Sequence, residues 1–243
     1  EDRIGAFKFG ANIKFMKLYQ KPRFGINGWI ITFYESSPRL SPEIYRKARS
    51  IKVYKKIIPA GCVRVYSAYV DLEDFCNNQA DLKTVGWMDR IKTLDFGRST
   101  KYVKLYQKKD YSRAGWVQLI PRSDFRIFVE HPEDTRSMKV YNAIPRGCVR
   151  VFDEPDYQGD VEDFCKDNSD LKRDGWVDRI SSFKIGRGLY SIRLYQRKGF
   201  RRGTGNWYHT FSKDVPRLES PFNNDSRSLR LVKDTRSRPW LRR

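Results

Sequence analysis

The sequence repeats itself, and this repetition limits the possible folds more than any other feature. A Gly-Cys-Val-Arg-Val-aromatic segment, an acidic segment ending in Phe-Cys and a Gly-Trp-x-Asp-Arg-Ile segment occur twice in the same order. They span residues 61–66, 71–76 and 86–91 in one copy and residues 147–152, 160–165 and 175–180 in the other. We call this pattern motif A.

A second pattern, motif B, follows each copy of motif A. It starts with a basic-Leu-Tyr-Gln-basic segment at residues 17–21, 104–108 and 193–197, leads to a tryptophan, and closes with Arg-Ser and a short apolar segment. The tryptophans are Trp29, Trp116 and Trp207, and the closing segments begin at Arg49, Arg136 and Arg227. This order predicts a truncated domain at residues 1–57, complete domains at residues 58–142 and 143–233, and a basic tail at residues 234–243.

The local patterns within each motif indicate β-structure. Short segments in which Val, Leu or Ile alternates with Arg or Lys, such as 63–65, 103–105 and 192–194, predict strands with one buried and one solvated face. Gly, Pro, Asn and Asp separate these segments, and aromatic residues make up 14% of the chain. We therefore expect an all-β protein in which each A–B pair forms an antiparallel sandwich.

The motifs resemble a known family. Residues 152–159, Phe-Asp-Glu-Pro-Asp-Tyr-Gln-Gly, are similar to the aromatic-and-glycine hairpin of βγ-crystallin Greek keys, as are residues 19–25. The Ser-Ser-Phe-Lys-Ile-Gly segment at residues 181–186 fits the family's closing strand, whereas the hairpin at residues 66–72 is shortened and lacks glycine. The resemblance implies tandem βγ-crystallin-like Greek-key β-sandwich domains, two complete and one truncated at the N-terminus.

Nothing in the sequence points to catalysis. The two histidines, His131 and His209, fall at unrelated places in the repeat, and no GxSxG, HExxH or phosphate-loop motif is present. We therefore predict that the protein is not an enzyme. No stretch of 18 apolar residues exists, so we expect no membrane span.

The four cysteines occupy equivalent places in the two copies of motif A. Cys62 and Cys76 flank one hairpin, and Cys148 and Cys165 flank the other, which predicts two disulfides; two pairs of buried free thiols are the alternative. If the disulfides form, an extracellular or secretory-granule location follows.

Many βγ-crystallin relatives bind calcium, and the resemblance identifies the positions to inspect. The family uses Asn or Asp at the second position of one motif with Ser or Thr at the fifth position of its partner. The fifth positions here are Gly5, Lys92, Ser181, Arg49, Arg136 and Arg227. Only Asn224 with Ser181 keeps the oxygen pairing, so we expect no cofactor beyond one weakly bound calcium ion.

The same alignment places an arginine opposite an aspartate three times. The pairs are Asp2 with Arg49, Asp89 with Arg136, and Asp178 with Arg227. We predict that these are ion pairs standing where calcium would sit, because a guanidinium group suits a carboxylate. The alternative is that the arginines point to solvent.

A net charge of +20 indicates either a solvated surface or attraction to polyanions. Candidate polyanion-binding residues are the basic residues at strand positions expected to face outward and those of the tail: Arg64, Lys104, Arg150, Arg193, Arg236, Arg238, Arg242 and Arg243. No motif for reading RNA or DNA bases is present.

Residue 1 aligns inside a motif A, just before its final strand, since residues 2–4 match residues 89–91. We expect the rest of this motif to come from a cleaved upstream fragment or from a neighbouring copy, with an incompletely sequenced chain as the alternative. The function hypothesis is a non-catalytic, secreted or stored structural protein that self-assembles and binds polyanions. The alternative is a secreted effector, such as an antimicrobial, a toxin component or a protease inhibitor, and a nucleic-acid-associated protein is a third option.

Overall fold

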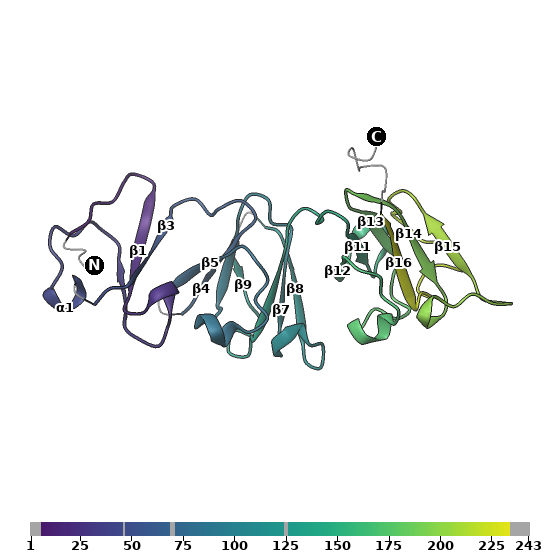
Figure 1. Ribbon diagram of the computed structural model, residues 1–243, viewed down its shortest axis with the longest axis horizontal. Helices are drawn as coiled ribbons and strands as arrows, with labels where there is room; N and C mark the ends of the chain where they lie inside the picture. The colour runs from purple at the N-terminus through teal and green to yellow at the C-terminus, as the bar shows by residue number, and fades with distance from the viewer. Residues whose placement is uncertain (1–5, 46, 69–70, 124–125, 234–243) are drawn as a thin grey trace, which may run out of the picture. The chain divides into compact units, whose positions relative to one another are not determined.

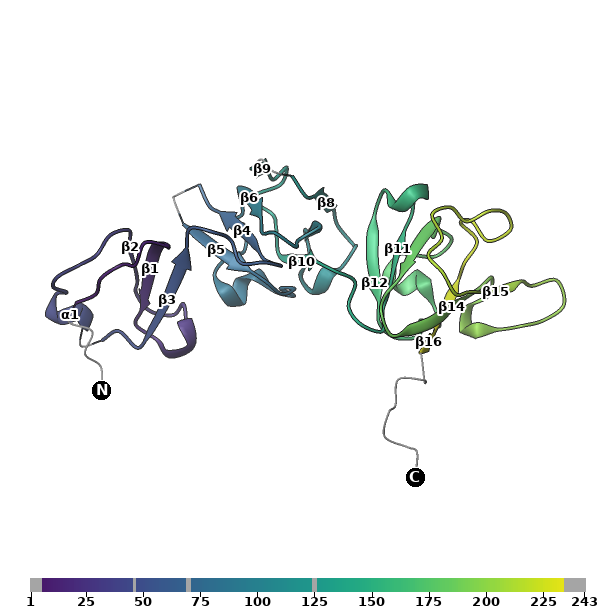
Figure 2. The ribbon, with the colours of Figure 1, turned by 90° about the horizontal axis from the view of Figure 1, so that it is seen from above.

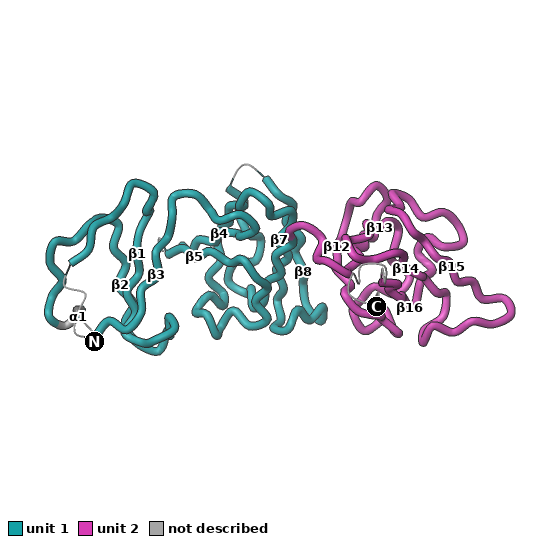
Figure 3. The backbone as a smooth tube through the Cα atoms, turned by 45° about the horizontal axis from the view of Figure 1, so that its top comes forward, with its two compact units in different colours: residues 1–141 teal, residues 142–243 magenta. Residues whose placement is uncertain are grey.

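The computed structural model describes residues 6–45, 47–68, 71–123 and 126–233 and divides into two compact units, unit 1 at residues 1–141 and unit 2 at residues 142–243 (Figure 3). The described residues form an all-β structure, as predicted, with one four-residue α-helix and several short 3-10 turns. Unit 1 therefore contains the first predicted domain and most of the second, and the boundary expected between residues 57 and 58 stays a prediction.

Unit 1 contains strands β1 to β10 (Figure 1). They are β1 (Ile13–Tyr19), β2 (Ile30–Phe33), β3 (Ser50–Lys55), β4 (Val63–Tyr66), β5 (Leu72–Phe75), β6 (Thr93–Phe96), β7 (Tyr102–Tyr106), β8 (Val117–Pro121), β9 (Ile127–Phe128) and β10 (Ser137–Tyr141). Its helical segments are η1 (Pro22–Phe24), α1 (Pro42–Tyr45), η2 (Leu82–Val85) and η3 (Lys109–Tyr111). These strands build sheets of order β2-β1-β3, β5-β4-β6-β9 and β10-β7-β8.

Unit 2 contains strands β11 to β16, seen side by side in Figures 1 and 2. They are β11 (Val149–Phe152), β12 (Val161–Phe164), β13 (Ser182–Ile185), β14 (Leu189–Tyr195), β15 (Tyr208–Phe211) and β16 (Ser228–Lys233). The 3-10 turns are η4 (Pro155–Tyr157), η5 (Leu171–Asp174) and η6 (Lys198–Phe200). The two sheets have the orders β12-β11-β13 and β15-β14-β16, and all their pairings are antiparallel.

Motifs A and B exchange strand segments, which is the Greek-key arrangement. In unit 2, Asn168 of motif A bridges to Leu229 in the motif B sheet, and Val215 of motif B bridges to Phe183 in the motif A sheet. Unit 1 repeats the first exchange with a bridge from Gln79 to Met138 and the second with the pairing of β9 to β6. Each motif therefore completes the sheet of the other, and the two sheets enclose one core.

The core of each sandwich follows the sequence alternation. Val63, Val65, Leu94, Val103 and Leu105 are fully buried in one cluster of unit 1. Unit 2 has the equivalent cluster, which consists of Val149, Val151, Phe183, Ile192, Leu194 and Leu229 around the buried Trp176. The face of each strand predicted to be apolar is thus the face that packs inward.

A serine secures the hairpin turn of both motif types. The Ser228 hydroxyl accepts a hydrogen bond from the Phe200 backbone N–H at 3.1 Å and donates one to the Arg197 carbonyl at 2.7 Å. This stabilises a turn in which Phe200 has a φ of 58°, a left-handed conformation that non-glycine residues adopt at a cost. Ser50, Ser137 and Ser182 make the same pair of bonds in the other hairpins. The serine of the repeated Arg-Ser in motif B therefore has a structural explanation.

Candidate functional site: a basic sheet face against an acidic hairpin

Within the described part of unit 1, a group of charged side chains joins the β1–β3 sheet to the β4–β5 hairpin. Lys17 on β1 lies 3.6 Å from the Asp71 carboxylate and donates to the Leu72 carbonyl at 3.3 Å. Lys52 on β3 lies 2.5 Å from the Glu73 carboxylate, whose other oxygen accepts from the Tyr54 hydroxyl at 2.6 Å. Phe15, Tyr54 and Leu72 form a small buried cluster beside these contacts. We call this arrangement the sheet–hairpin contact.

Burial changes the proton affinities of the groups in this contact. Desolvation lowers the pKa of Lys17, against the opposing effect of Asp71 and Glu73. Desolvation also raises the pKa of Tyr54, and the negative charge of Glu73 raises it further. The tyrosine therefore stays a hydrogen-bond donor over the whole ordinary pH range. In each lysine–carboxylate contact one partner is largely buried, Lys17 in the first and Glu73 in the second.

A cleft of about 680 Å³ opens beside the sheet–hairpin contact. Lys17 and Lys52 line one wall, and Glu73, Trp87 and Arg90 line the other. Arg90 lies 2.5 Å from Asp71 and stacks 5.4 Å from the centre of the Trp87 ring. Lys17 with Asp71 and Lys52 with Glu73 are thus engaged across the cleft.

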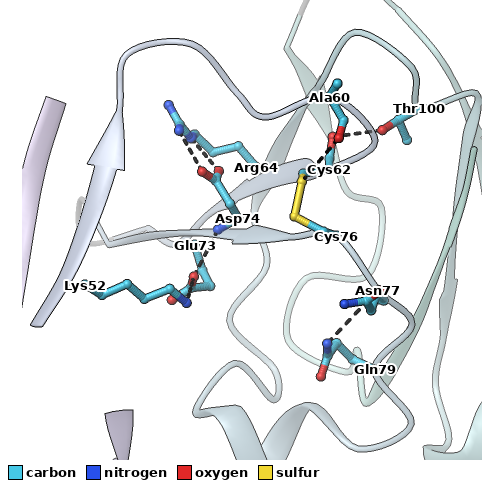
Figure 4. The surroundings of a disulfide bond; sticks show 10 residues. All are labelled: Lys52, Ala60, Cys62, Arg64, Glu73, Asp74, Cys76, Asn77, Gln79 and Thr100. Atoms are coloured by element: carbon cyan, nitrogen blue, oxygen red, sulfur yellow. Dashed lines mark hydrogen bonds and ion pairs between the residues drawn. A yellow bond between two sulfur atoms is a disulfide. The ribbon is translucent and has the colours of Figure 1, made fainter. Parts of the chain in front are cut away.

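Arg64 and Arg150 correct the prediction of a polyanion surface. Arg64 is 1% exposed and forms a bidentate ion pair with Asp74, with hydrogen bonds of 2.7 and 2.8 Å (Figure 4). Its guanidinium also donates to the Lys55 carbonyl at 2.9 Å and to the Lys56 carbonyl at 3.4 Å. Arg150 is 4% exposed, pairs with Asp163 at the same two distances and donates to the Asn142 carbonyl. Both arginines are buried and donate to backbone carbonyls of the segment that precedes their own strand in the sequence, so neither is available to a polyanion.

Lys104 is also buried, with its ammonium group 5.9 Å from the ring centres of Tyr106 and Tyr141, so the prediction that it binds polyanions is wrong as well. Arg193 is half-buried and donates to the Thr210 hydroxyl at 2.8 Å. Arg236, Arg238, Arg242 and Arg243 lie outside the described residues.

The structure pairs the cysteines as predicted, Cys62 with Cys76 (Figure 4) and Cys148 with Cys165. Each disulfide links the residue before the first strand of motif A to the residue after the returning strand, beside the Arg64 and Arg150 ion pairs. These pairs are compatible with an extracellular location.

The calcium-type positions come together in unit 2. The Ser181 hydroxyl donates to the Asn224 side-chain oxygen at 2.9 Å, and Asn224 has a φ of 52°. These two oxygens are far fewer than the six to eight that calcium requires, and the described residues contain no cluster of three or more His, Cys, Asp or Glu suited to a metal. Weak calcium binding stays a prediction.

The predicted arginine–aspartate pairs have three different outcomes. Arg227 lies 3.4 Å from Asp178, as predicted, and both side chains are partly exposed. Arg136 instead lies 3.8 Å from Asp134, two residues earlier, while Asp89 keeps a buried oxygen without a hydrogen bond, so this pair is wrong. Burial raises the pKa of Asp89, and the charge of Arg136 opposes this effect. Asp2 lies outside the described residues.

The two histidines lie in different units, each against aromatic rings. His131 packs against Trp116 in unit 1, and His209 packs against Phe211 and Phe222 in unit 2. Within the described part of the chain, no helix has the length and apolar character needed to cross a bilayer.

The sequence did not identify Asp71, Glu73, Lys17 and Lys52 as a set. A signal was present, because Asp71-Leu72-Glu73 returns as Asp160-Val161-Glu162 and Lys17 returns as Lys104 and Arg193. The repeat shows which segments are equivalent in the different copies of a motif. It does not show which of these segments lie in contact in the folded protein.

Two antiparallel sheets that exchange strands between motifs define the class of protein: a Greek-key β-sandwich. Residues 148–232 match the family model described as Beta/Gamma crystallin. The domain at residues 148–232 is therefore a βγ-crystallin domain, as the sequence resemblance predicted.

Solved structures that part of this chain is similar to include a βγ-crystallin from Ciona intestinalis, with 16% identity, 35% of this chain and 99% of that chain covered, and a TM-score of 0.30. A βγ-crystallin domain from Flavobacterium johnsoniae has 23% identity, 36% and 96% coverage, and a TM-score of 0.32. The N-terminal domain of protein S has 26% identity, 35% and 96% coverage, and a TM-score of 0.31. Likenesses at this level add nothing to the family match. A search of curated proteins found no match.

Proposed function

We propose that this protein is a non-catalytic structural protein, secreted or stored, in which βγ-crystallin domains are joined by contacts between a basic sheet face and an acidic hairpin. The observation that supports this most directly is the sheet–hairpin contact of unit 1. Lys17, Lys52 and Tyr54 on one side are engaged with Asp71, Leu72 and Glu73 on the other. Charged groups held in this way restrain a junction rather than a substrate.

The end of β3 offers a test of this junction, because Lys55, the last residue of the strand, and Lys56, which follows it, are exposed trypsin sites. Replacing Glu73 by alanine removes the acceptor of both Lys52 and Tyr54. Cleavage after Lys55 or Lys56 should then accelerate by about tenfold, because losing a charged hydrogen bond makes local opening easier. Glu133→Ala is the control, since Glu133 is an exposed carboxylate of the same unit. Equal cleavage rates in the two variants would contradict the proposal.

Polyanion binding is the second part of this proposal, and it now rests on exposed cations. Arg197, Lys198, Arg201 and Arg202 are all exposed between β14 and β15, and the Arg202 guanidinium lies 4.4 Å from the Tyr208 ring centre. Heparin affinity should fall steeply with salt, and Arg201→Gln with Arg202→Gln should reduce the salt slope by about two. Salt-insensitive binding, or none at low salt, would favour a merely solvated surface. A stable monomer that perturbs cells at low dose would favour the effector role instead.

A further inference from the structure

The β15-β14-β16 sheet of unit 2 repeats the geometry of the β2-β1-β3 sheet of unit 1. The pairing of Lys17 with Lys52 across β1 and β3 returns as Arg193 with Arg230 across β14 and β16. Both pairs of strands also have a register irregularity at their outer end, between Ile13 and Phe15 and between Leu189 and Ser191. The face of unit 2 that carries Arg193 and Arg230 is thus the counterpart of the face that the β4–β5 hairpin covers in unit 1.

This counterpart face, which we call the arginine face, is more open to solvent. The Lys17 and Lys52 side chains are 8% and 34% exposed in the sheet–hairpin contact. On the arginine face the Arg230 side chain is 47% exposed, Tyr208 is 44% exposed, and Thr210 is exposed. The opposite side of the same sheet is fully engaged, because Ile192, Leu194 and Leu229 are buried in the core.

The two arginines of this face are held in position by contacts that differ from the lysine–carboxylate contacts of the sheet–hairpin contact. Arg193 donates to Thr210, and its guanidinium lies 5.8 Å from the Tyr208 ring centre. Arg230 stacks 4.2 Å from the Phe200 ring centre and lies 3.8 Å from Asp167, with both side chains of that pair about half exposed. An exposed ion pair at this distance contributes little, so it leaves Arg230 able to bind a better-placed carboxylate.

We propose that the arginine face docks an acidic β-hairpin of the kind that β4 and β5 form, carried by another Greek-key domain. An Asp-apolar-Glu edge strand would place its carboxylates on Arg193 and Arg230, as Asp71 and Glu73 lie on Lys17 and Lys52 in unit 1. Arginine suits this role because its planar fork binds a carboxylate through two hydrogen bonds. The proposal rests on the structural role above and extends it from a junction within the chain to assembly.

The experiment titrates the full-length protein with a synthetic peptide of residues 61–77, closed by its own disulfide and followed by the chemical shifts of β14–β16 amides. We expect salt-sensitive binding of the peptide. In the double variant Arg193→Gln with Arg230→Gln, the affinity should fall by about tenfold or more, because each substitution removes a charged contact. Lys172→Gln with Lys213→Gln is the matched control, since both are exposed lysines of unit 2 with no described ion pair. A peptide with Asp71→Asn and Glu73→Gln should bind as weakly as the natural peptide binds the double arginine variant.

A second measurement covers the case in which the free peptide does not fold as a hairpin. Residues 61–77 are attached to the C-terminus of the full-length protein by a flexible Gly-Ser linker, which raises their effective concentration to roughly millimolar. Docking should slow amide exchange in β15 and β16, and the double arginine variant should remove this protection. Unchanged exchange in the tethered protein would overturn the proposal.

Two further outcomes would also overturn it. Equal hairpin binding by the natural protein and the double arginine variant would show that the arginine face is not the site. Heparin binding that depends on Arg193 and Arg230, without any hairpin binding, would assign the face to polyanions. The trypsin experiment tests the contact of Glu73 in unit 1. Its result on the proposed structural role is therefore independent of the results on the arginine face.

Discussion

Replacing Arg64 by methionine removes a buried guanidinium while leaving its partners in place. The Arg64 side chain is 1% exposed, the Asp74 side chain is 11% exposed, and the two are joined by two hydrogen bonds. Breaking a buried ion pair from one side costs about 3–5 kcal/mol, because the remaining charge is left without compensation. We therefore expect Arg64→Met to lower the local stability of the β4–β5 hairpin by about 3 kcal/mol or more.

The second half of this prediction separates charge from packing. In Arg64→Met with Asp74→Leu no charge is left buried, so we expect the double variant to recover about 2 kcal/mol of the loss. Recovery is incomplete because the Lys55 and Lys56 carbonyls still lose their donor.

Hydrogen exchange of β4 and β5 amides in the native state measures this local stability directly. Arg150→Met, alone and with Asp163→Leu, provides a matched pair in unit 2 that should affect β11 and β12 in the same way. A loss of less than about 1 kcal/mol in Arg64→Met, or a double variant as unstable as the sum of its single variants, would refute the reasoning.

Three more predictions concern the disulfides, a tyrosine and calcium. The disulfides join cysteines 14 and 17 residues apart in the sequence. Replacing either cysteine pair by serine should therefore lower the unfolding free energy of its own unit by about 3 kcal/mol, measured by chemical unfolding. An unchanged unfolding midpoint after reduction would contradict this prediction. Burial and then the bond to Asp95 raise the pKa of Tyr66 to about 12. The stabilisation that comes from this raised pKa should be present below about pH 10 and be lost as the pH rises toward 12. The free energy of unfolding should therefore fall less steeply with pH in Tyr66→Phe than in the natural protein over that range. An identical slope in the two proteins would contradict this prediction. Calcium should shift the melting temperature little, and calorimetry should find any binding abolished by Asn224→Ala; two ions per domain would be incompatible with this view.

Much of the fold could be predicted from local patterns. The alternation in β4, β7 and β14 identified the strands and their core-facing residues, and the repeat identified the two copies of the cysteine pair. The Asp178–Arg227 contact followed from the family's pairing of positions, whereas Asp89 and Arg136 did not meet because Asp134 lies closer to the arginine.

The candidate site was less accessible to this reasoning. The carboxylates Asp71 and Glu73 read as ordinary solvated residues of a hairpin, and their partners Lys17 and Lys52 lie tens of residues earlier. Only the packing of the β4–β5 hairpin on the β1–β3 sheet brings them together.

The sequence by itself determined the all-β class, the two motifs, the core faces of the strands and the cysteine partners. These properties depend on period-two alternation and on spacing within one motif, both of which are written locally. Only the tertiary structure decided the fate of the second face of each strand. Arg64 and Arg150 occupy positions that alternate with core valines, as solvent-facing residues do, yet both are buried against carboxylates and backbone carbonyls. Alternation distinguishes the two faces of a strand, but whether water or another segment covers the second face depends on contacts between residues distant in the chain.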